Sequence, residues 1–170
     1  MLYLLDANIL ITASNSYYPL DQVPEFWSWL QHQAAAGHVK IPQEVIEEIE
    51  EGRDDDPLKV WISNDENKGA LLLAETVDAT LVQRVVATGY APDLTDDEVE
   101  KIGRDPFLIA YALVERTLRC VVTTEVSKPS AQRQNRKIPD VCAAVGAQCL
   151  GPFEFNKSLG FRTAWRNAGG

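Results

Sequence analysis

Four acidic residues occupy positions from which their carboxylates could work together. They are Asp6, Glu48, Asp105 and Glu125, and each follows a short apolar run or lies near the start of a helical one. Asp6 is the least expected, because it interrupts the apolar stretch MLYLLDANILI and burying an unpaired carboxylate is costly. Carboxylates gathered in one place repel one another unless a cation lies between them. Oxygen ligands of this kind suit Mg²⁺ or Mn²⁺, and no His or Cys belongs to the set.

Each of these acids also has an ordinary structural interpretation. Asp105 precedes Pro106 and is suited to be the N-cap of a helix that begins there. Glu48 lies in the helical pattern EVIEEIEE, where it could be a solvated acid, and Glu44 and Glu47 compete with it for a functional role. The identity of the second acid therefore stays open among these three glutamates. The fourth acid could be a plain residue at the end of a strand.

Short apolar strands alternate with amphipathic helices along the chain. The sequence predicts strands in LYLL, HVKIP, RCVVTTE and QCLGPFEF, and helices in VPEFWSWLQHQAAAG, QEVIEEIEEG, TVDATLVQRVVATG and DPFLIAYALVE. Thr95 and Glu98 match a capping box. Alternation of this kind is typical of a parallel sheet covered on both faces, in which ligands bind beyond the carboxyl ends of the strands. We expect an α/β fold in which the four acids meet at that edge.

The composition is that of a globular domain. The chain has 170 residues, of which 45% are hydrophobic and 24% are charged, enough for one domain with a sizeable core. No apolar run approaches the roughly 18 residues that span a bilayer, and no basic segment precedes the first apolar run, so we expect no membrane segment and no signal peptide. Three cysteines without CxxC spacing favour reduced thiols and a cytoplasmic location.

The net charge of −9 is distributed unevenly. Residues 1–115 carry 22 acidic and 7 basic residues, a net charge of −15, whereas residues 116–170 carry 3 and 9, a net charge of +6. Many of these bases follow Glu125 in a polar, loop-like segment, and they could bind phosphates in a salt-dependent manner or simply form a solvated basic loop. The segment has no aromatic residue on which a base could stack. Its candidate phosphate-binding residues, which would contact the backbone of a nucleic acid, are Lys128, Arg133, Arg136 and Lys137.

Four segments of the chain resemble, in the expected order, the acidic signatures of the PIN-domain nucleases. They are LLDANILI, IPQEVIEEI, DPFLIAYAL and VVTTE. The resemblance implies a compact parallel α/β sheet flanked by helices, with residues 1–170 forming a single PIN-like domain. The largely helical segment at about 53–104 is longer than its counterpart in the smallest toxins of this kind, and the tail IPDVCAAVGAQCLGPFEF resembles a longer, poorly characterised branch of PIN-like proteins. One departure concerns Glu125, since the family usually has Asp at that position.

The resemblance also implies a function and a set of site residues. PIN domains cut single-stranded nucleic acid, usually RNA, with Mg²⁺ or Mn²⁺, and many are toxins of toxin–antitoxin pairs. The implied activity is therefore that of a metal-dependent endoribonuclease, with a cognate antitoxin as its partner. The implied catalytic acids are Asp6, Glu48, Asp105 and Glu125, of which the first three bind the metal. Asn8 and Thr123 match the residues that support them.

Other functions compete with this one. A PIN-like scaffold that has lost catalysis could bind RNA or a partner protein. A phosphatase of the haloacid-dehalogenase type also begins with a strand and an Asp, but it needs a second Asp two places later, where this chain has Asn8. PIN toxins are often homodimers, and the aromatic stretch EFWSWL is either such an interface or an ordinary core helix.

Overall fold

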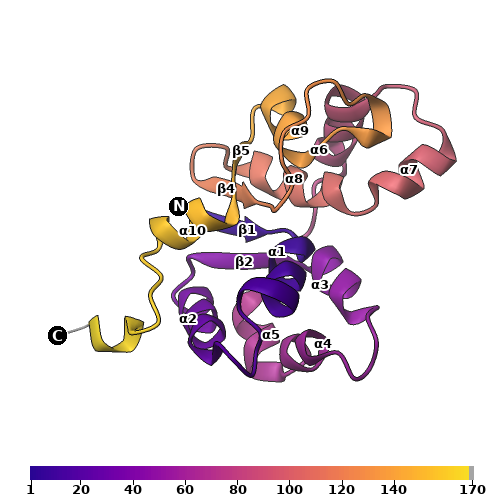
Figure 1. Ribbon diagram of the computed structural model, residues 1–170. Helices are drawn as coiled ribbons and strands as arrows, with labels where there is room; N and C mark the ends of the chain where they lie inside the picture. Colours follow the sequence, from indigo (N-terminus) through magenta and orange to yellow (C-terminus); the bar gives the residue numbers. More distant parts are fainter. Residues whose placement is uncertain (169–170) are drawn as a thin grey trace.

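Five parallel strands form the sheet of the molecule, which the computed structural model describes over residues 1–168 (Figure 1). Their order across the sheet is β3-β2-β1-β4-β5, so β1 lies at the centre. The α/β class and the parallel sheet flanked by helices are thereby confirmed. The strands are β1 (Leu2–Leu5), β2 (Val39–Pro42), β3 (Leu72–Leu73), β4 (Arg119–Val122) and β5 (Gln148–Leu150).

Ten α-helices connect and cover these strands within the described residues. They are α1 (Ala7–Thr12), α2 (Pro24–Ala35), α3 (Gln43–Glu50), α4 (Pro57–Ile62), α5 (Asp65–Leu71), α6 (Ala79–Arg84), α7 (Asp96–Ile102), α8 (Asp105–Val114), α9 (Ile138–Val145) and α10 (Pro152–Ser158). π-Helical segments extend α1 over Ala13–Tyr17 and α6 over Val85–Tyr90, and 3₁₀ turns span Arg133–Asn135 and Trp165–Ala168. No helix in residues 1–168 is long and apolar enough to cross a membrane.

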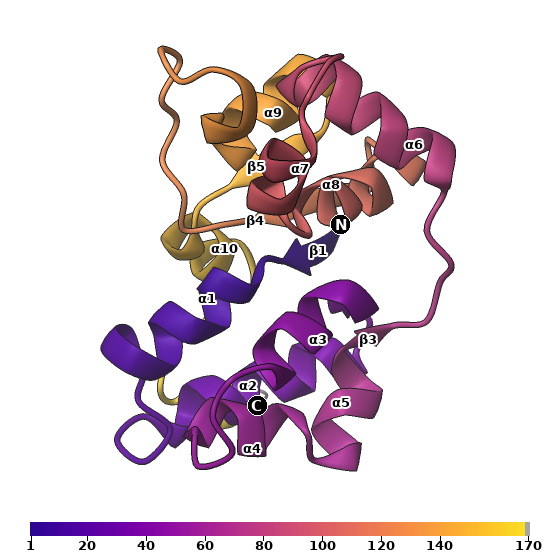
Figure 2. The same cartoon turned by 90° about the vertical axis from the view of Figure 1, so that its right-hand side faces the viewer.

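The helices divide into two groups about β1. Figures 1 and 2 show α2–α5 gathered on the side of β2 and β3, and α6–α9 gathered on the side of β4 and β5. An extended segment at residues 74–78 links β3 to α6 and carries the chain from one group to the other (Figure 2). The sequence predicts a largely helical segment at about 53–104, and most of it is helical, but β3 adds a two-residue edge strand that the sequence does not predict.

The core explains why the apolar runs form strands. Leu4 and Leu5 of β1 and all four residues of β4 are buried, as expected for central strands with helices on both faces. The aromatic stretch of α2 belongs to this core, because Phe26, Trp27 and Trp29 are all buried. EFWSWL is therefore a core helix, and these rings are not available as a dimer surface in the folded chain.

The C-terminal strand ends earlier than the sequence predicts. QCLGPFEF is a strand only over Gln148–Leu150, after which α10 begins at Pro152. Proline is favoured in the first turn of a helix, and Glu154 accepts a hydrogen bond from the Gly151 N–H, so this end of the stretch is helical. The capping box at Thr95 and Glu98 is confirmed at the start of α7.

Gly89 allows the π-helical segment after α6 to pack closely against α9. A Cβ atom at this position would lie 2.5 Å from Cγ1 of Val141, which is closer than side-chain packing permits. The Gly89 carbonyl also accepts a hydrogen bond from the Arg136 guanidinium. This close approach therefore fixes the distance between α9 and the segment that ends at Tyr90.

Replacing Gly89 with Ala should destabilise the protein by about 1–3 kcal/mol, because the new methyl group forces two packed elements apart. Gly69 is the matched control, since it lies inside α5 with no atom within 4 Å of an added Cβ. Gly69→Ala should leave the free energy of unfolding unchanged or raise it by about 0.5–1 kcal/mol. Urea unfolding of both variants measures the difference, and equal stabilities would show that the packing against α9 is loose.

Candidate active site

Asp6 lies at the carboxyl end of β1, beside the end of β4. Its backbone N–H donates to the Val122 carbonyl at 3.0 Å, which continues the pairing of the two strands by one residue. Its side chain is buried, and the Thr123 hydroxyl donates to Asp6 Oδ2 at 2.9 Å. Burial raises the pKa of Asp6 to about 6, and the hydrogen bond from Thr123 opposes that shift. Asn8 assists through its backbone N–H, which also lowers this pKa, while the residue itself is exposed.

Asp105 is the first residue of α8 and does not act as its N-cap, so that prediction was wrong. Arg104 holds the N-cap position, and the Asp105 side chain points instead to the Tyr90 hydroxyl, which donates to Oδ2 at 3.4 Å. The pKa of Asp105 is raised to about 8 by burial, then by the negative charges of Asp6, Glu125 and Glu48. Three other carboxylates can raise the pKa of Asp105 because all of them lie near it.

Glu48 is the member of the α3 cluster that reaches this neighbourhood. Its charge raises the pKa of both Asp6 and Asp105. Glu44 turns toward the Tyr111 hydroxyl, which lies 3.4 Å from its Oε1, and Glu47 accepts from Gln43 at 3.0 Å. Partial burial raises the pKa of Glu48 itself, and the nearby Arg104 guanidinium lowers it.

Glu125 follows β4 and is joined to the first acid through Thr123. The Thr123 hydroxyl accepts from the Glu125 N–H at 3.1 Å while it donates to Asp6. The Glu125 carboxylate accepts from Lys137 Nζ at 3.0 Å on Oε1 and from the Ile138 N–H at 2.7 Å on Oε2. Glu125 is therefore a neighbour of Asp6 through Thr123, but both oxygens of its carboxylate are already engaged.

The donor set has the chemistry of a divalent-cation site, although its side chains are not gathered around one point. Within residues 1–168, no three His, Cys, Asp or Glu side chains are arranged to hold an ion. Asp6, Glu48 and Asp105 nevertheless offer hard oxygen ligands, and their mutual repulsion is what a cation would relieve.

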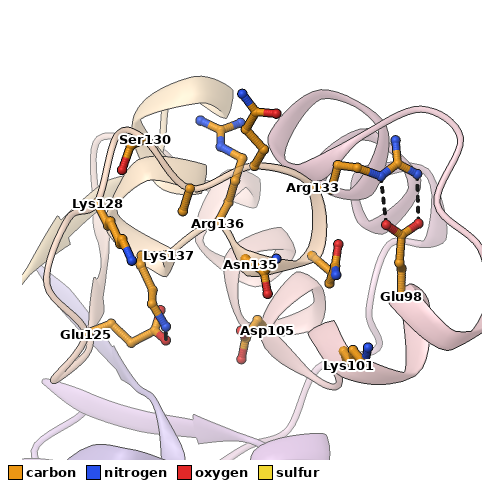
Figure 3. A pocket seen from close by; sticks show the side chains of 13 residues that line it. Glu98, Lys101, Asp105, Glu125, Lys128, Ser130, Arg133, Asn135, Arg136 and Lys137 are labelled. Atoms are coloured by element: carbon orange, nitrogen blue, oxygen red, sulfur yellow. Dashed lines mark hydrogen bonds and ion pairs between the residues drawn. The ribbon is translucent and has the colours of Figure 1, made fainter.

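A cavity of about 920 Å³ opens above the acids, between α7, α8 and the basic loop 126–137. Figure 3 shows Asp105 and Glu125 on its lower side and the loop arching over it. A smaller cavity of about 270 Å³ is lined by Glu48 and also by Asp105 and Lys101, which line the larger one as well. Asp105 thus faces two cavities, one that Glu125 also lines and one that Glu48 also lines.

The four predicted RNA-binding residues all line the larger cavity, but they are not equivalent. Arg133 has a positive φ of 53° and holds Glu98 through two hydrogen bonds of 2.7 Å, with a third at 2.8 Å to Asp93 (Figure 3). This interaction lowers the pKa of Glu98 to about 2. The Arg133 charge is therefore committed to attaching the loop to α7.

Lys128, Arg136 and Lys137 differ in whether their positive charge is already paired with a carboxylate of the protein. Lys137 is paired with Glu125, whereas the Arg136 guanidinium donates to two backbone carbonyls, those of Gly89 and Asp140. The Lys128 ammonium makes no ion pair within residues 1–168, and neither does that of Lys101 on α7, which lines the same cavity. Sequence reasoning missed Lys101 and Tyr90, because nothing in their local pattern marks them as neighbours of Asp105.

Comparison with known proteins gives one match. A family model described as a domain of unknown function (DUF4411) matches residues 3–163, a range that includes the four acids and the basic loop. No curated protein and no solved structure matches the chain.

Replacing Asp105 with Asn should stabilise the metal-free protein, increasingly so as the pH rises from about 4 to 8. The pKa of Asp105 is higher in the folded chain than its ordinary value of 3.8, so the folded state binds more protons and loses stability across that interval. Asn cannot be deprotonated, so the variant does not lose stability over this pH interval. Thermal unfolding in a chelator at several pH values measures the difference between variant and wild type.

Asp97→Asn is the control for the loss of one negative charge, since Asp97 is exposed on α7. A difference between Asp105→Asn and wild type that stays constant with pH would mean that Asp105 is not under electrostatic strain. A large loss of stability at every pH would assign Asp105 a structural role.

Proposed function

Because the chain belongs to the DUF4411 family of unknown function, we propose an activity from its own residues: Mg²⁺- or Mn²⁺-dependent hydrolysis of phosphodiester bonds in single-stranded RNA. One observation carries the proposal. Asp6, Glu48, Asp105 and Glu125 act electrostatically on one another at the carboxyl ends of parallel strands, beside an open cavity. The resemblance of the surrounding segments to the signatures of PIN-domain nucleases supports the same activity.

In this proposal Asp6, Glu48 and Asp105 hold the cation. The cation would lower the pKa of a bound water and offset the charge that develops on the phosphate. Thr123 fixes the orientation of the Asp6 carboxylate, and the Tyr90 hydroxyl does the same for Asp105. Burial of Asp6 keeps bulk water away from its carboxylate oxygens, whereas Asp105 is partly exposed at the cavity. Carboxylate ligands bind the ion without adding a nucleophile that would compete with water.

The basic wall of the cavity supplies the affinity for RNA that the acids cannot. Lys128, Arg136 and Lys101 line the cavity and make no ion pair with a carboxylate within residues 1–168. They would bind backbone phosphates in a salt-dependent way that does not depend on sequence. The wall has no aromatic side chain, so base stacking adds little selectivity there.

The resemblance further supports narrower proposals about biology. A cytoplasmic endoribonuclease of this kind would be the toxin of a toxin–antitoxin pair, with a cognate antitoxin that covers the acidic site. A homodimer interface would have to use a surface other than the aromatic face of α2, because those rings are buried.

A binding scaffold without catalysis is the second candidate function. It is favoured by the engagement of both Glu125 oxygens and by the spread of the other acids, which leaves no ready-made ion site in residues 1–168. Such a scaffold would bind RNA through the same basic wall and would need no divalent ion. The phosphatase alternative is weaker, because Asn8 is exposed where that chemistry needs a second acid.

The purified chain should cleave single-stranded RNA when Mg²⁺ or Mn²⁺ is present and should not cleave it in a chelator. The Asp6→Asn, Asp105→Asn double variant should lose this activity, because two of three metal ligands become neutral. Gel analysis of an RNA panel measures cleavage, and growth arrest on expression of wild type but not the variant would support the toxin role. Equal cleavage by the variant would reveal a contaminating nuclease.

Replacing both Lys128 and Arg136 with Ala should weaken RNA binding about equally for all sequences. The slope of log affinity against log salt should fall by about 0.7 for each phosphate that the protein no longer neutralises. Binding is measured in the Asp6→Asn background, which keeps the ligand intact. Lys157→Ala is the matched control, since Lys157 lies on α10, far from α7 in Figure 1. An unchanged slope in the double variant would exclude this wall as the RNA path.

A further inference from the structure

Glu125 differs from the other three acids in having a cation of the protein itself beside it. Lys137 Nζ lies 3.0 Å from Oε1, and the Ile138 N–H donates to Oε2 at 2.7 Å. Figure 3 shows the two side chains meeting on the lower left of the cavity. No such cation lies within ion-pair distance of Asp6, Glu48 or Asp105 in residues 1–168.

The Lys137–Glu125 pair is held from both sides. Lys137 immediately precedes α9, whose first residue Ile138 is buried, so the backbone at this point is set by core packing. Glu125 is held by the hydrogen bond from its N–H to the Thr123 hydroxyl. Two fixed backbones and a second, charge-assisted bond from the Ile138 N–H make this pair more persistent than an isolated surface ion pair.

We propose that Lys137 is a built-in cation of the site, which takes the place of a second divalent ion at Glu125. The chain then binds one divalent ion, held by Asp6, Glu48 and Asp105. This inference rests on the proposed function, because it concerns how many ions that site accepts. The role of Glu125 is then to hold Lys137 and the start of α9, and Glu125 is not a metal ligand.

Electrostatics supports the single ion. A two-ion phosphodiesterase site places its cations about 4 Å apart, so that both reacting oxygens are covered. An ammonium group already in contact with Glu125 would repel a second dication at that position and would compete with it for Oε1, while the Ile138 N–H occupies Oε2. An ammonium group has three donors, so Lys137 can hold Glu125 and still donate to a phosphate in the cavity that it lines.

Titration of the chain with Mn²⁺ tests the proposal without using activity. Calorimetry, with free Mn²⁺ followed by electron paramagnetic resonance, should give one ion per wild-type chain. Glu125→Gln should keep one ion with nearly unchanged affinity, whereas Asp105→Asn should weaken binding by at least about tenfold. Lys137→Ala should admit a second, weaker ion, because Glu125 then loses its ammonium partner. Lys137→Arg, which keeps the charge, should again bind one.

The Mn²⁺ titrations give different results if the proposed function is wrong and if only the role of Lys137 is wrong. If the wild type binds no Mn²⁺, the metal-dependent function is itself wrong. If it binds two ions, or if Glu125→Gln weakens binding as much as Asp105→Asn, the role of Lys137 is overturned while the function stands. A single ion in Lys137→Ala would also overturn that role.

Lys128→Ala, in the same loop, is the matched control for loss of a lysine and should bind one ion. Circular dichroism checks the fold of each variant. If Lys137→Ala does not fold, the comparison of Glu125→Gln with Asp105→Asn decides by itself.

Discussion

Repulsion among carboxylates is the constraint around which this end of the molecule is built. The parallel sheet brings the carboxyl ends of β1 and β4 together, and the hydrogen bond from the Asp6 N–H to Val122 extends that pairing to the first acid. Helices α3 and α8 then add Glu48 and Asp105. The cost is visible in the raised pKa values of Asp6 and Asp105, which a free carboxyl group in water would not have.

The carboxyl groups of Asp6, Asp105 and Glu125 have different hydrogen-bonding partners, so the two ends of the site differ in charge. Asp6 relies on a neutral hydroxyl from Thr123 and Asp105 on one from Tyr90. Glu125 alone has a full positive charge in contact. The carboxyl groups without a charged partner are therefore Asp6 and Asp105, away from Lys137, and their raised pKa values show that both hold a proton more readily than in water. Hydroxyl groups orient a carboxylate without neutralising it, so this side keeps its attraction for a cation.

Much of the fold is predictable from the sequence, because apolar runs and helix signals are local. Strands β1, β2 and β4 and the helix of EFWSWL follow from hydrophobic pattern. β3 does not, because its two residues form a strand only through pairing with Ile41 and Pro42. The placement of Asp6 also follows from the sequence, since a parallel sheet puts ligand-binding residues at its carboxyl edge.

Long-range pairings account for what sequence reasoning missed in the site. Arg133 meets Glu98 across 35 positions, and Tyr90 meets Asp105 across 15. No local sequence pattern predicts such partners. A basic run in the sequence therefore looks uniform, although one of its charges attaches the loop to α7, another is paired with Glu125 and only part of the rest is available to a ligand.

The basic loop is attached at two places, by Lys137 at its base and by Arg133 near its middle. A loop attached in this way, to α7 through Arg133 and to Glu125 through Lys137, has fewer conformations open to it than a loop held only at its ends. The folded chain has then already lost part of the conformational entropy that a mobile loop would lose on binding a ligand.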